Sequence, residues 1–391
     1  MPLSDSLLNL NGYVIDHLNG INPIQVVARF CGEVLCPNCG CGDLRKKTRF
    51  TRILRHESIG SRRCELHLTA HKFFCRGCGK YFNQRFPGIL KWFRSTEAFR
   101  REVFEKHHLG ISQRDLARSV KIGAATIERW YHSFLKKKKS EMQEQHYPKY
   151  LGIDEHSFSK KHGFVTTLCS LDRHQILDIL PGKSREKILP HLMQIKGRES
   201  VEMVCMDLCD HYRSLVKDVF PNARIVADRF HVIRLINQSF LKTWHLFDPS
   251  ARYSRALLSL MRRHVWHLKP DQLTRLHRYF QKFPGLRAIY DFKQNLVRLL
   301  LKKHRTVSQS KRLIPRLLNA VSQLQNAHFD PLVTLGNTLH SWINEIACMW
   351  RFTKTNSITE GFHRKMKLIQ RRAYGFKNFQ NYRLRVCVLC C

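Results

Sequence analysis

The stretch YLGIDEHSF, at residues 150–158, begins the part of the sequence that decides the fold. Two more short apolar runs, GFVTTLCSLD (163–172) and HQILDILPG (174–182), follow after polar breaks, which predicts an antiparallel meander of three strands. The compact runs VEMVCMD (201–207) and ARIVAD (223–228) are typical of strands buried on both faces. Helix-compatible segments lie between and after them. We therefore expect the order three strands, helix, strand, helix, strand, helix.

Acidic residues stand at positions in these strands where a rigid backbone would hold a side chain at the sheet edge. Asp154 lies within the first run, Asp207 ends the fourth and Asp228 ends the fifth. Strand ends of this kind suit metal ligands. Asp207 and Asp228 compete for the role of second metal ligand. The alternative role of Asp207 is to cap the following helix, and that of Asp228 is a buried ion pair with His231.

Glu360 is the third candidate carboxylate. It is the only acidic residue in 351–391, where ten Lys and Arg occur. The segment NSITEGFHRKMKLIQRR (356–372) predicts a helix on which Glu360, His363 or Arg364, and Lys367 share a face. The cations would steer a phosphate backbone. Glu360 could equally be a first-turn glutamate that the helix dipole favours.

Three carboxylates of this kind, Asp154, Asp207 and Glu360, form a plausible site for two Mg²⁺ or Mn²⁺ ions. An ion pair held in this way activates a water or a 3′-hydroxyl and stabilises the leaving oxygen in phosphoryl transfer. The sequence therefore predicts a metal-dependent enzyme acting on phosphodiesters.

The charge of the chain indicates its partner. There are 68 Lys and Arg against 30 Asp and Glu in 391 residues, a formal net charge of +38. Because cations along the whole chain release counterions from phosphates, double-stranded DNA is the expected partner. No run approaches the roughly 18 apolar residues of a membrane span, and the first residues lack the pattern of a secretion signal. We expect a cytoplasmic protein with no membrane partner.

Two Cys-x-x-Cys-Gly knuckles, CPNCG (36–40) and CRGCG (75–79), predict a structural Zn²⁺ site. The preferred ligands are Cys36, Cys39, Cys75 and Cys78, and a hairpin could fill the gap between the knuckles. Other residues nearby leave the ligand choice open: Cys31, Cys41, Cys64, His67 and His71. Residues 31–140 hold 25 Lys and Arg against 9 Asp and Glu, so the metal would organise a DNA-binding surface.

The segment ISQRDLARSVKIGAATIERWYHSF (111–134) fits a helix-turn-helix. Ser112 can cap the first helix and Gly123 lies near the turn. In this motif the second helix enters the major groove, which directs Thr126 and Arg129 toward bases or phosphates. Arg114 on the first helix is a further candidate for DNA contact.

The sequence thus divides into four parts: a lead-in (1–30), a zinc-binding domain (31–90), a helix-turn-helix domain (95–139) and a catalytic domain (148–391) with a helical insertion at about 232–350. The expected fold class is multidomain α/β.

The chain resembles the ISL-three group of bacterial insertion-sequence transposases, which belong to the DDE superfamily. The likeness rests on GIDEHSF (152–158), VCMDLCDHY (204–212), ADRFHV (227–232) and TNSITEGFHRKMK (355–367), with the zinc knuckles and the helix-turn-helix before them. It implies a ribonuclease-H-like catalytic core. Carried over by position, Asp154, Asp207 and Glu360 match the catalytic triad.

The resemblance also implies supporting residues. Asp228 and His231 match an Asp-x-x-His motif, and Glu360 and Lys367 match a Glu-x6-Lys motif. The implied function is binding of terminal inverted repeats followed by DNA strand cleavage and strand transfer, on the nucleoid and in a self-associated synaptic complex. Two alternatives remain open: a non-catalytic zinc-finger and helix-turn-helix regulator derived from a transposase, and a sequence-independent nuclease with the same core.

Overall fold

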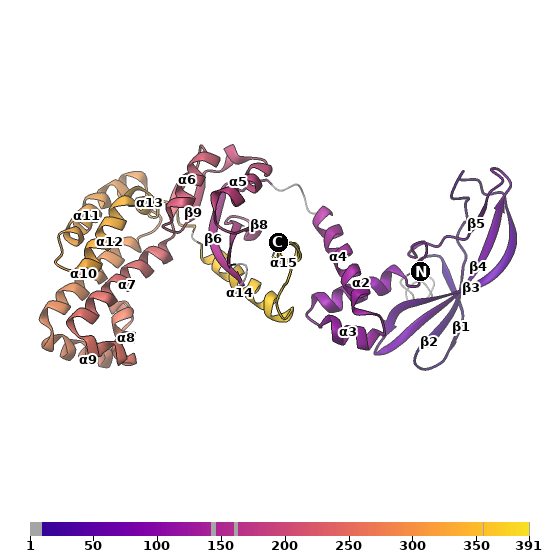
Figure 1. Ribbon diagram of the computed structural model, residues 1–391, viewed down its shortest axis with the longest axis horizontal. Coiled ribbons are helices and arrows are strands. Elements are labelled where there is room, and N and C mark those ends of the chain that lie inside the picture. The colour runs from indigo at the N-terminus through magenta and orange to yellow at the C-terminus, as the bar shows by residue number, and fades with distance from the viewer. Residues whose placement is uncertain (1–9, 142–145, 160–162, 355, 391) are drawn as a thin grey trace. The chain divides into compact units, whose positions relative to one another are not determined.

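The computed structural model describes residues 10–141, 146–159, 163–354 and 356–390 (Figure 1). The first nine residues of the expected lead-in lie outside this part. The chain forms two compact units: an N-terminal unit of Met1–Glu141 with Arg371–Gly375, and a C-terminal unit of Met142–Gln370 with Phe376–Cys391. Each is described by itself.

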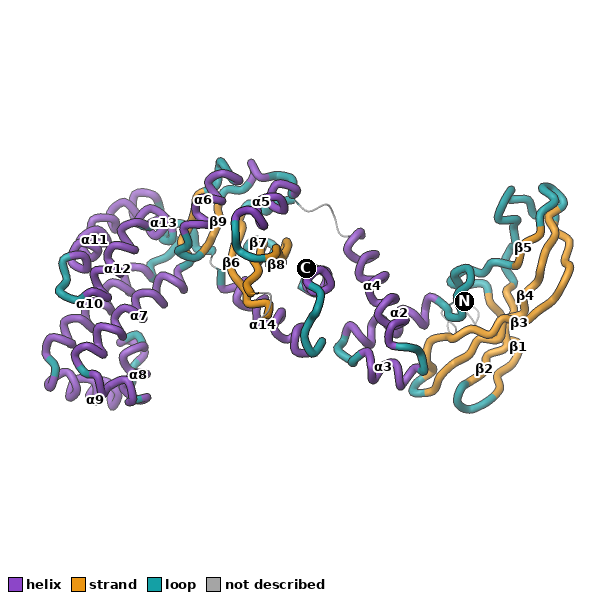
Figure 2. Tube along the Cα trace, in the orientation of Figure 1, coloured by secondary structure: helices purple, strands orange, loops and turns teal. Residues whose placement is uncertain are grey.

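A five-stranded sheet forms the base of the N-terminal unit (Figure 2). Its strands are β1 (Tyr13–Asn19), β2 (Ile24–Phe30), β3 (Leu44–Ile59), β4 (Arg62–Cys75) and β5 (Tyr81–Asn83). The order is β1-β2-β4-β3, with β5 paired to β4, and β2 runs parallel to β4. Residues 13–30, expected as a lead-in, are therefore two strands of this sheet. The long β3–β4 hairpin fills the gap between the two cysteine knuckles.

Three helices follow the sheet: α2 (Glu97–His108), α3 (Gln113–Val120) and α4 (Ala124–Glu141). The Ser112 hydroxyl accepts a hydrogen bond from the Asp115 backbone N–H at 3.1 Å and caps α3, as expected. Lys121, at φ 51°, ends this helix in the left-handed region. Leu116 and Ile127 are buried against α2, so the two helices joined by this short turn share one core.

The C-terminal unit holds a mixed sheet of order β10-β9-β6-β7-β8. Its strands are β6 (Tyr150–Ser159), β7 (Gly163–Ser170), β8 (Gln175–Pro181), β9 (Met203–Met206) and β10 (Arg224–Ala227). The first three are antiparallel, whereas β9 and β10 run parallel to β6. With α5 (Arg185–Gln194) and α6 (Asp210–Val219) between them, the order of elements expected from the sequence is confirmed.

Helices make up the long stretch after β10. They are α7 (Arg229–Phe247), α8 (Arg255–Arg262), α9 (Pro270–Lys282), α10 (Pro284–Leu300), α11 (Val307–Gln325), α12 (Asp330–Ser341) and α13 (Ile343–Cys348). Short 3-10 turns complete the unit: η1 (Arg198–Ser200), η2 (Pro249–Tyr253) and η3 (Val265–His267). Together with the sheet, most of these helices share one hydrophobic core. None of the described helices combines the length and apolar character that a membrane span requires.

The last two helices, α14 (Ser357–Arg372) and α15 (Phe379–Leu389), return to the sheet. Met366 of α14 and Tyr382 of α15 are buried in a cluster with Phe158 of β6 and Ile179 of β8. A carboxyl-terminal segment more than 150 residues along the chain from β8 therefore covers one part of the sheet, which brings the Glu360 helix to β6.

Candidate functional site

Asp154 lies in the middle of β6, opposite Thr167 of β7. It is 8% exposed, and its Oδ1 accepts a hydrogen bond from the Glu155 backbone N–H at 2.7 Å. The alternation of β6 turns its apolar neighbours Leu151 and Ile153 into the core. A buried carboxylate in a central strand needs a partner that stabilises its charge.

Asp207 and Asp228 lie side by side because their strands are parallel neighbours. Ala227 of β10 is in register with Met206 of β9, and each aspartate follows directly. The Asp228 backbone N–H donates to Met206 O at 2.7 Å. Asp228 also caps α7, since its carboxylate accepts from the Phe230 N–H at 3.4 Å. Both the preferred and the competing second carboxylate therefore stand at the same edge of the sheet.

His231 joins the two aspartates. Its Nδ1 lies 2.5 Å from Asp207 Oδ1 and 2.8 Å from Asp228 Oδ2. Burial lowers the pKa of His231, but the two carboxylates outweigh this and raise it to about 10. One ligand atom from each of the three residues fits within 4.8 Å of the others, a grouping suited to a metal ion. The ion pair between Asp228 and His231 is thus part of this group.

Electrostatics connect Asp154 to the same group. Burial is the larger cause and the neighbouring Asp207 carboxylate the next, and together they raise the pKa of Asp154 to about 7. The His231 charge opposes them. Four of the residues singled out from the sequence, Asp154, Asp207, Asp228 and His231, therefore lie in one region at the meeting of three strands.

Helix α14 contacts β6 beside Asp154. Buried Asn356, immediately before the helix, donates from Nδ2 to the Ile153 carbonyl at 3.1 Å. Its own carbonyl accepts the Glu360 N–H at 2.9 Å. Gly152 makes this approach possible, since a β-carbon there would lie 2.8 Å from Asn356 Oδ1. The close contact holds the first turn of α14, and Glu360 with it, against β6.

His363 is the residue of α14 that faces Asp154. Its Nδ1 lies 3.7 Å from Asp154 Oδ2, and its Nε2 is 3.2 Å from the Thr167 hydroxyl. Burial, then the nearby His156 and Lys367, lower the pKa of His363 to about 3, so the ring is neutral near pH 7. The sequence placed His363 only on a shared helix face. Its spacing of three residues from Glu360 is the signal that could have singled it out.

Glu360 is the candidate that the structure does not bring into contact with the aspartates. The side chain of Glu360 is half exposed, and its Oε1 accepts a hydrogen bond from the Arg364 guanidinium at 3.2 Å. Lys367 lies near enough to His156 and His363 to lower the pKa of both. The helix face that carries Glu360 thus borders the site through His363.

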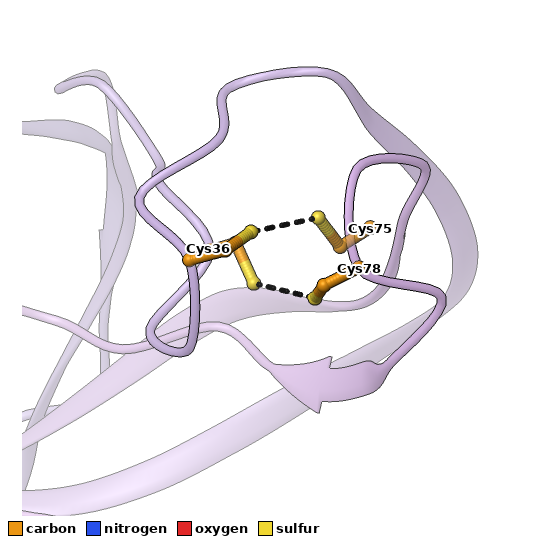
Figure 3. A group of neighbouring side chains, drawn as sticks. Cys36, Cys75 and Cys78 are labelled. Atoms are coloured by element: carbon orange, nitrogen blue, oxygen red, sulfur yellow. Dashed lines mark hydrogen bonds between the residues drawn. The ribbon is translucent and has the colours of Figure 1, made fainter.

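The four knuckle cysteines come together in the N-terminal unit. Cys36 Sγ lies 3.7 Å from Cys78 Sγ (Figure 3). Cys39 Sγ lies 3.6 Å from Cys75 Sγ. A tetrahedral zinc with bonds of about 2.3 Å separates its sulfurs by about 3.8 Å, so the spacing fits that ion.

The knuckle turns and the remaining cysteines agree with this choice of ligands. Gly40 and Gly79 have φ values of 73° and 69°, and each donates its N–H to the carbonyl of the first cysteine of its knuckle, at 2.9 Å in both. This left-handed turn suits glycine. Cys64 is instead buried in the sheet core, and Cys31 is exposed. The four preferred ligands form the one sulfur group suited to a metal in the described part of the chain.

The residues expected to contact DNA lie on exposed faces of α3 and α4. Arg114 and Arg129 are exposed and Thr126 is half-buried. Arg129 donates from its guanidinium to Thr126 Oγ1 at 3.0 Å, so the two side chains lie on one face of α4. Both cations are free of ion pairs within the described residues.

Comparison with known proteins identifies the family of the chain. Residues 151–386 match a family described as "Transposase", the DDE family of the ISL3 group. The chain is also similar to the transposase for insertion sequence element IS1001 of Bordetella parapertussis. That similarity is 23% identity over 367 residues, covering 90% of this chain and 88% of the relative. The family match spans the mixed sheet, the helices after it and α14.

Proposed function

This chain belongs to the ISL3 family of DDE transposases, and from that premise we propose that it binds the terminal inverted repeats of an insertion sequence and cuts and joins DNA strands with divalent metal ions. The observation that carries the proposal is the grouping of Asp207, Asp228 and His231 at the ends of β9 and β10, together with the electrostatic interaction of this group with Asp154 in the middle of β6. The strand order β10-β9-β6-β7-β8 supports a ribonuclease-H-like core for this site.

We assign the metal to Asp154, Asp207 and Glu360. Two Mg²⁺ or Mn²⁺ ions held there would activate the attacking water or 3′-hydroxyl and stabilise the leaving oxygen. The residues fit such ions, because carboxylate oxygens are the ligands that Mg²⁺ prefers. The raised pKa of Asp154, about 7, supports this, because burial and then the neighbouring Asp207 carboxylate disfavour the charged form, which a bound cation would stabilise. Asp228 is the alternative second ligand.

We propose that other residues of the site orient the three carboxylates and hold the DNA backbone. His231 bridges Asp207 and Asp228 and so fixes the orientation of the Asp207 carboxylate. Glu360 lies three residues before His363, and residues at this spacing are neighbours on a helix surface. We therefore place Glu360 on the face of α14 that meets Asp154. Arg364 and Lys367, on the following turns, are the residues that we expect to hold the phosphate backbone of the strand being cut.

The N-terminal unit supplies end recognition in this proposal. We propose that α3 and α4 act as a helix-turn-helix, with Thr126 and Arg129 directed to the major groove and Arg114 to a phosphate. The four cysteines would hold Zn²⁺, and the ion would stabilise the two knuckles at the ends of the basic β3–β4 hairpin. The excess of 25 Lys and Arg over 9 Asp and Glu in residues 31–140 supports DNA as the partner of this unit.

Strand transfer joins two element ends to one target, so we propose that the protein self-associates on DNA in a synaptic complex. Its place of action would be the bacterial nucleoid in the cytoplasm, where the element and its targets lie. These assignments follow from the reaction and the charge of the chain.

A joining assay tests the proposal. The substrates are an oligonucleotide duplex that ends in the terminal repeat with a free 3′-hydroxyl, and a supercoiled plasmid target, incubated with the full chain and Mg²⁺ or Mn²⁺. We expect covalent joining by wild type and none by Asp154→Asn. Equal binding of both proteins to the repeat serves as the control. Joining by Asp154→Asn at the wild-type rate would refute the assignment of the site.

A further inference from the structure

A cavity of about 360 Å³ opens between α10 and α11, in the helical stretch of the C-terminal unit. Four apolar residues form part of its wall. The polar remainder is three cations and three amides: Arg298, Lys302, Arg316, Asn295, Asn319 and Gln323. The volume is that of a site for a ligand of modest size. Its lining holds no carboxylate.

The cations of this cavity are not neutralised by the protein. Arg298, Lys302 and Arg316 form no ion pair with an acid in the part of the chain that the structure describes. The sequence offers few acids locally, because residues 292–329 contain eight Lys and Arg and no Asp or Glu. Grouped cations without counter-charges repel one another unless an anion binds between them.

The side chains lie in rows on the two helices. Asn295 and Arg298 on α10, and Arg316, Asn319 and Gln323 on α11, follow the spacing of three and four residues that places side chains on one helix face, and Lys302 lies just beyond the end of α10. Cations therefore stand on both walls with amides beside them. Such a lining offers charge to a phosphate and N–H donors to its oxygens.

Arg298 is held at this position by an aromatic ring. Its guanidinium lies 5.1 Å from the centroid of Trp266, which is 40% exposed. His264 stacks on Trp266 with a centroid separation of 4.7 Å. A cation packed on an aromatic face keeps its donors directed outward, and less rotamer freedom is lost when it binds.

We propose that this groove is a second DNA site, which binds the phosphate backbone of a strand away from the carboxylates. The inference rests on the proposed action on DNA and adds a contact region that neither the three carboxylates nor the N-terminal unit supplies. DNA is favoured over a single small anion because the acid-free, basic stretch extends well beyond the cavity, through residues 292–329.

The test compares two triple variants of the full chain, Arg298→Ala/Lys302→Ala/Arg316→Ala in the groove and Arg275→Ala/Arg278→Ala/Lys282→Ala on the exposed face of α9. Both remove three charges. Affinity for duplex DNA is measured over a series of KCl concentrations. The slope of log K against log [salt] is negative, and each lost phosphate contact reduces its magnitude by about 0.9. We expect the magnitude of the slope to decrease by roughly 2 to 3 in the groove variant and by less than about 1 in the α9 variant.

Two further measurements separate this inference from folding and from the proposed function. Arg298→Lys/Arg316→Lys, which keeps the charge, is expected to keep the wild-type slope, and all variants should melt within a few degrees of wild type. Equal slopes for the two triple variants, with repeat binding and joining intact, would overturn the second site alone. Failure of wild type to bind or join DNA would overturn both proposals. Inorganic phosphate is added as a competitor of DNA at millimolar concentration. If it competes while the groove variant keeps the wild-type salt slope, the cavity binds a small anion, and the proposed second DNA site is overturned.

Discussion

Replacing Gly152 with alanine should disturb the proposed active site, because Gly152 contacts Asn356 and Thr359, about 200 residues further along the chain. A β-carbon there would lie 2.8 Å from Asn356 Oδ1 and 3.2 Å from Thr359 Oγ1, both at the start of α14. On the other side it would lie 2.9 Å from Leu171 Cδ2. Favourable contacts between non-bonded heavy atoms lie at about 3.5–4.0 Å, so α14 or Leu171 must retreat by roughly 0.5–1 Å.

The cost of this displacement has two parts. Overpacking of a filled core costs about 1–3 kcal/mol. For a unit of this size that corresponds to a melting temperature lower by roughly 2–4 °C per kcal/mol. Because α14 carries Glu360, a shift of α14 by up to about 1 Å is expected to lower the rate of DNA cleavage by up to about 100-fold.

The assay is cleavage of a plasmid that carries the element ends, together with thermal melting. Gly361→Ala is the matched control, because a β-carbon at Gly361 meets nothing within 4 Å. That variant should melt at or slightly above the wild-type temperature, since alanine favours a helix over glycine by up to about 1 kcal/mol. Wild-type stability and cleavage in Gly152→Ala would refute the reasoning, because α14 would then not depend on close contact with β6.

Three other variants extend the account to zinc, packing and pH. Cys75→Ala should lose bound zinc, measured by mass spectrometry, and lose repeat binding while the C-terminal unit keeps its melting temperature; retained zinc would contradict the four-sulfur site. Arg383→Met should lower the free energy of unfolding by about 3–5 kcal/mol, because Asp178 is buried and accepts from the Arg383 Nε at 2.7 Å. The double variant Arg383→Met/Asp178→Leu should recover most of the lost free energy of unfolding, and denaturant titration of both variants measures this. Because the pKa of Asp154 is raised to about 7, a metal ion must displace a proton at lower pH. Mn²⁺ affinity, measured by calorimetry, should therefore fall by up to about tenfold per pH unit below 7 and lose this dependence in Asp154→Asn, whereas a flat profile in wild type would argue against Asp154 as a ligand.

The sequence predicted the C-terminal sheet well because its signals are local. Each strand is a short apolar run between polar breaks, and an acid at the end of such a run is carried to the sheet edge by the strand itself. Parallel pairing of β9 and β10 then placed Asp207 beside Asp228. The grouping of the four knuckle cysteines was equally predictable, because the spacing of two cysteines in a tight turn involves only a few residues.

Other features depend on contacts that no local pattern reveals. Strand β2 pairs with β4, about 40 residues further along, and β1 pairs with β2; the weak periodicity of residues 13–30 did not indicate these strands. The position of His363 against Asp154 depends on α14 packing across β6 after more than 190 intervening residues. The interaction of His231 with both aspartates arises from a helix start that meets two strand ends, and the sequence motif alone paired His231 only with Asp228.

The most direct test of the three-carboxylate claim is cleavage of a supercoiled plasmid that carries the element ends, with Mg²⁺ or Mn²⁺, by wild type, Asp207→Ala and Glu360→Ala. The account predicts that wild type cuts at the end boundaries, whereas both variants bind the ends and leave them uncut. Binding by wild type without cleavage in either metal, or cleavage by either variant at the wild-type rate, would contradict it.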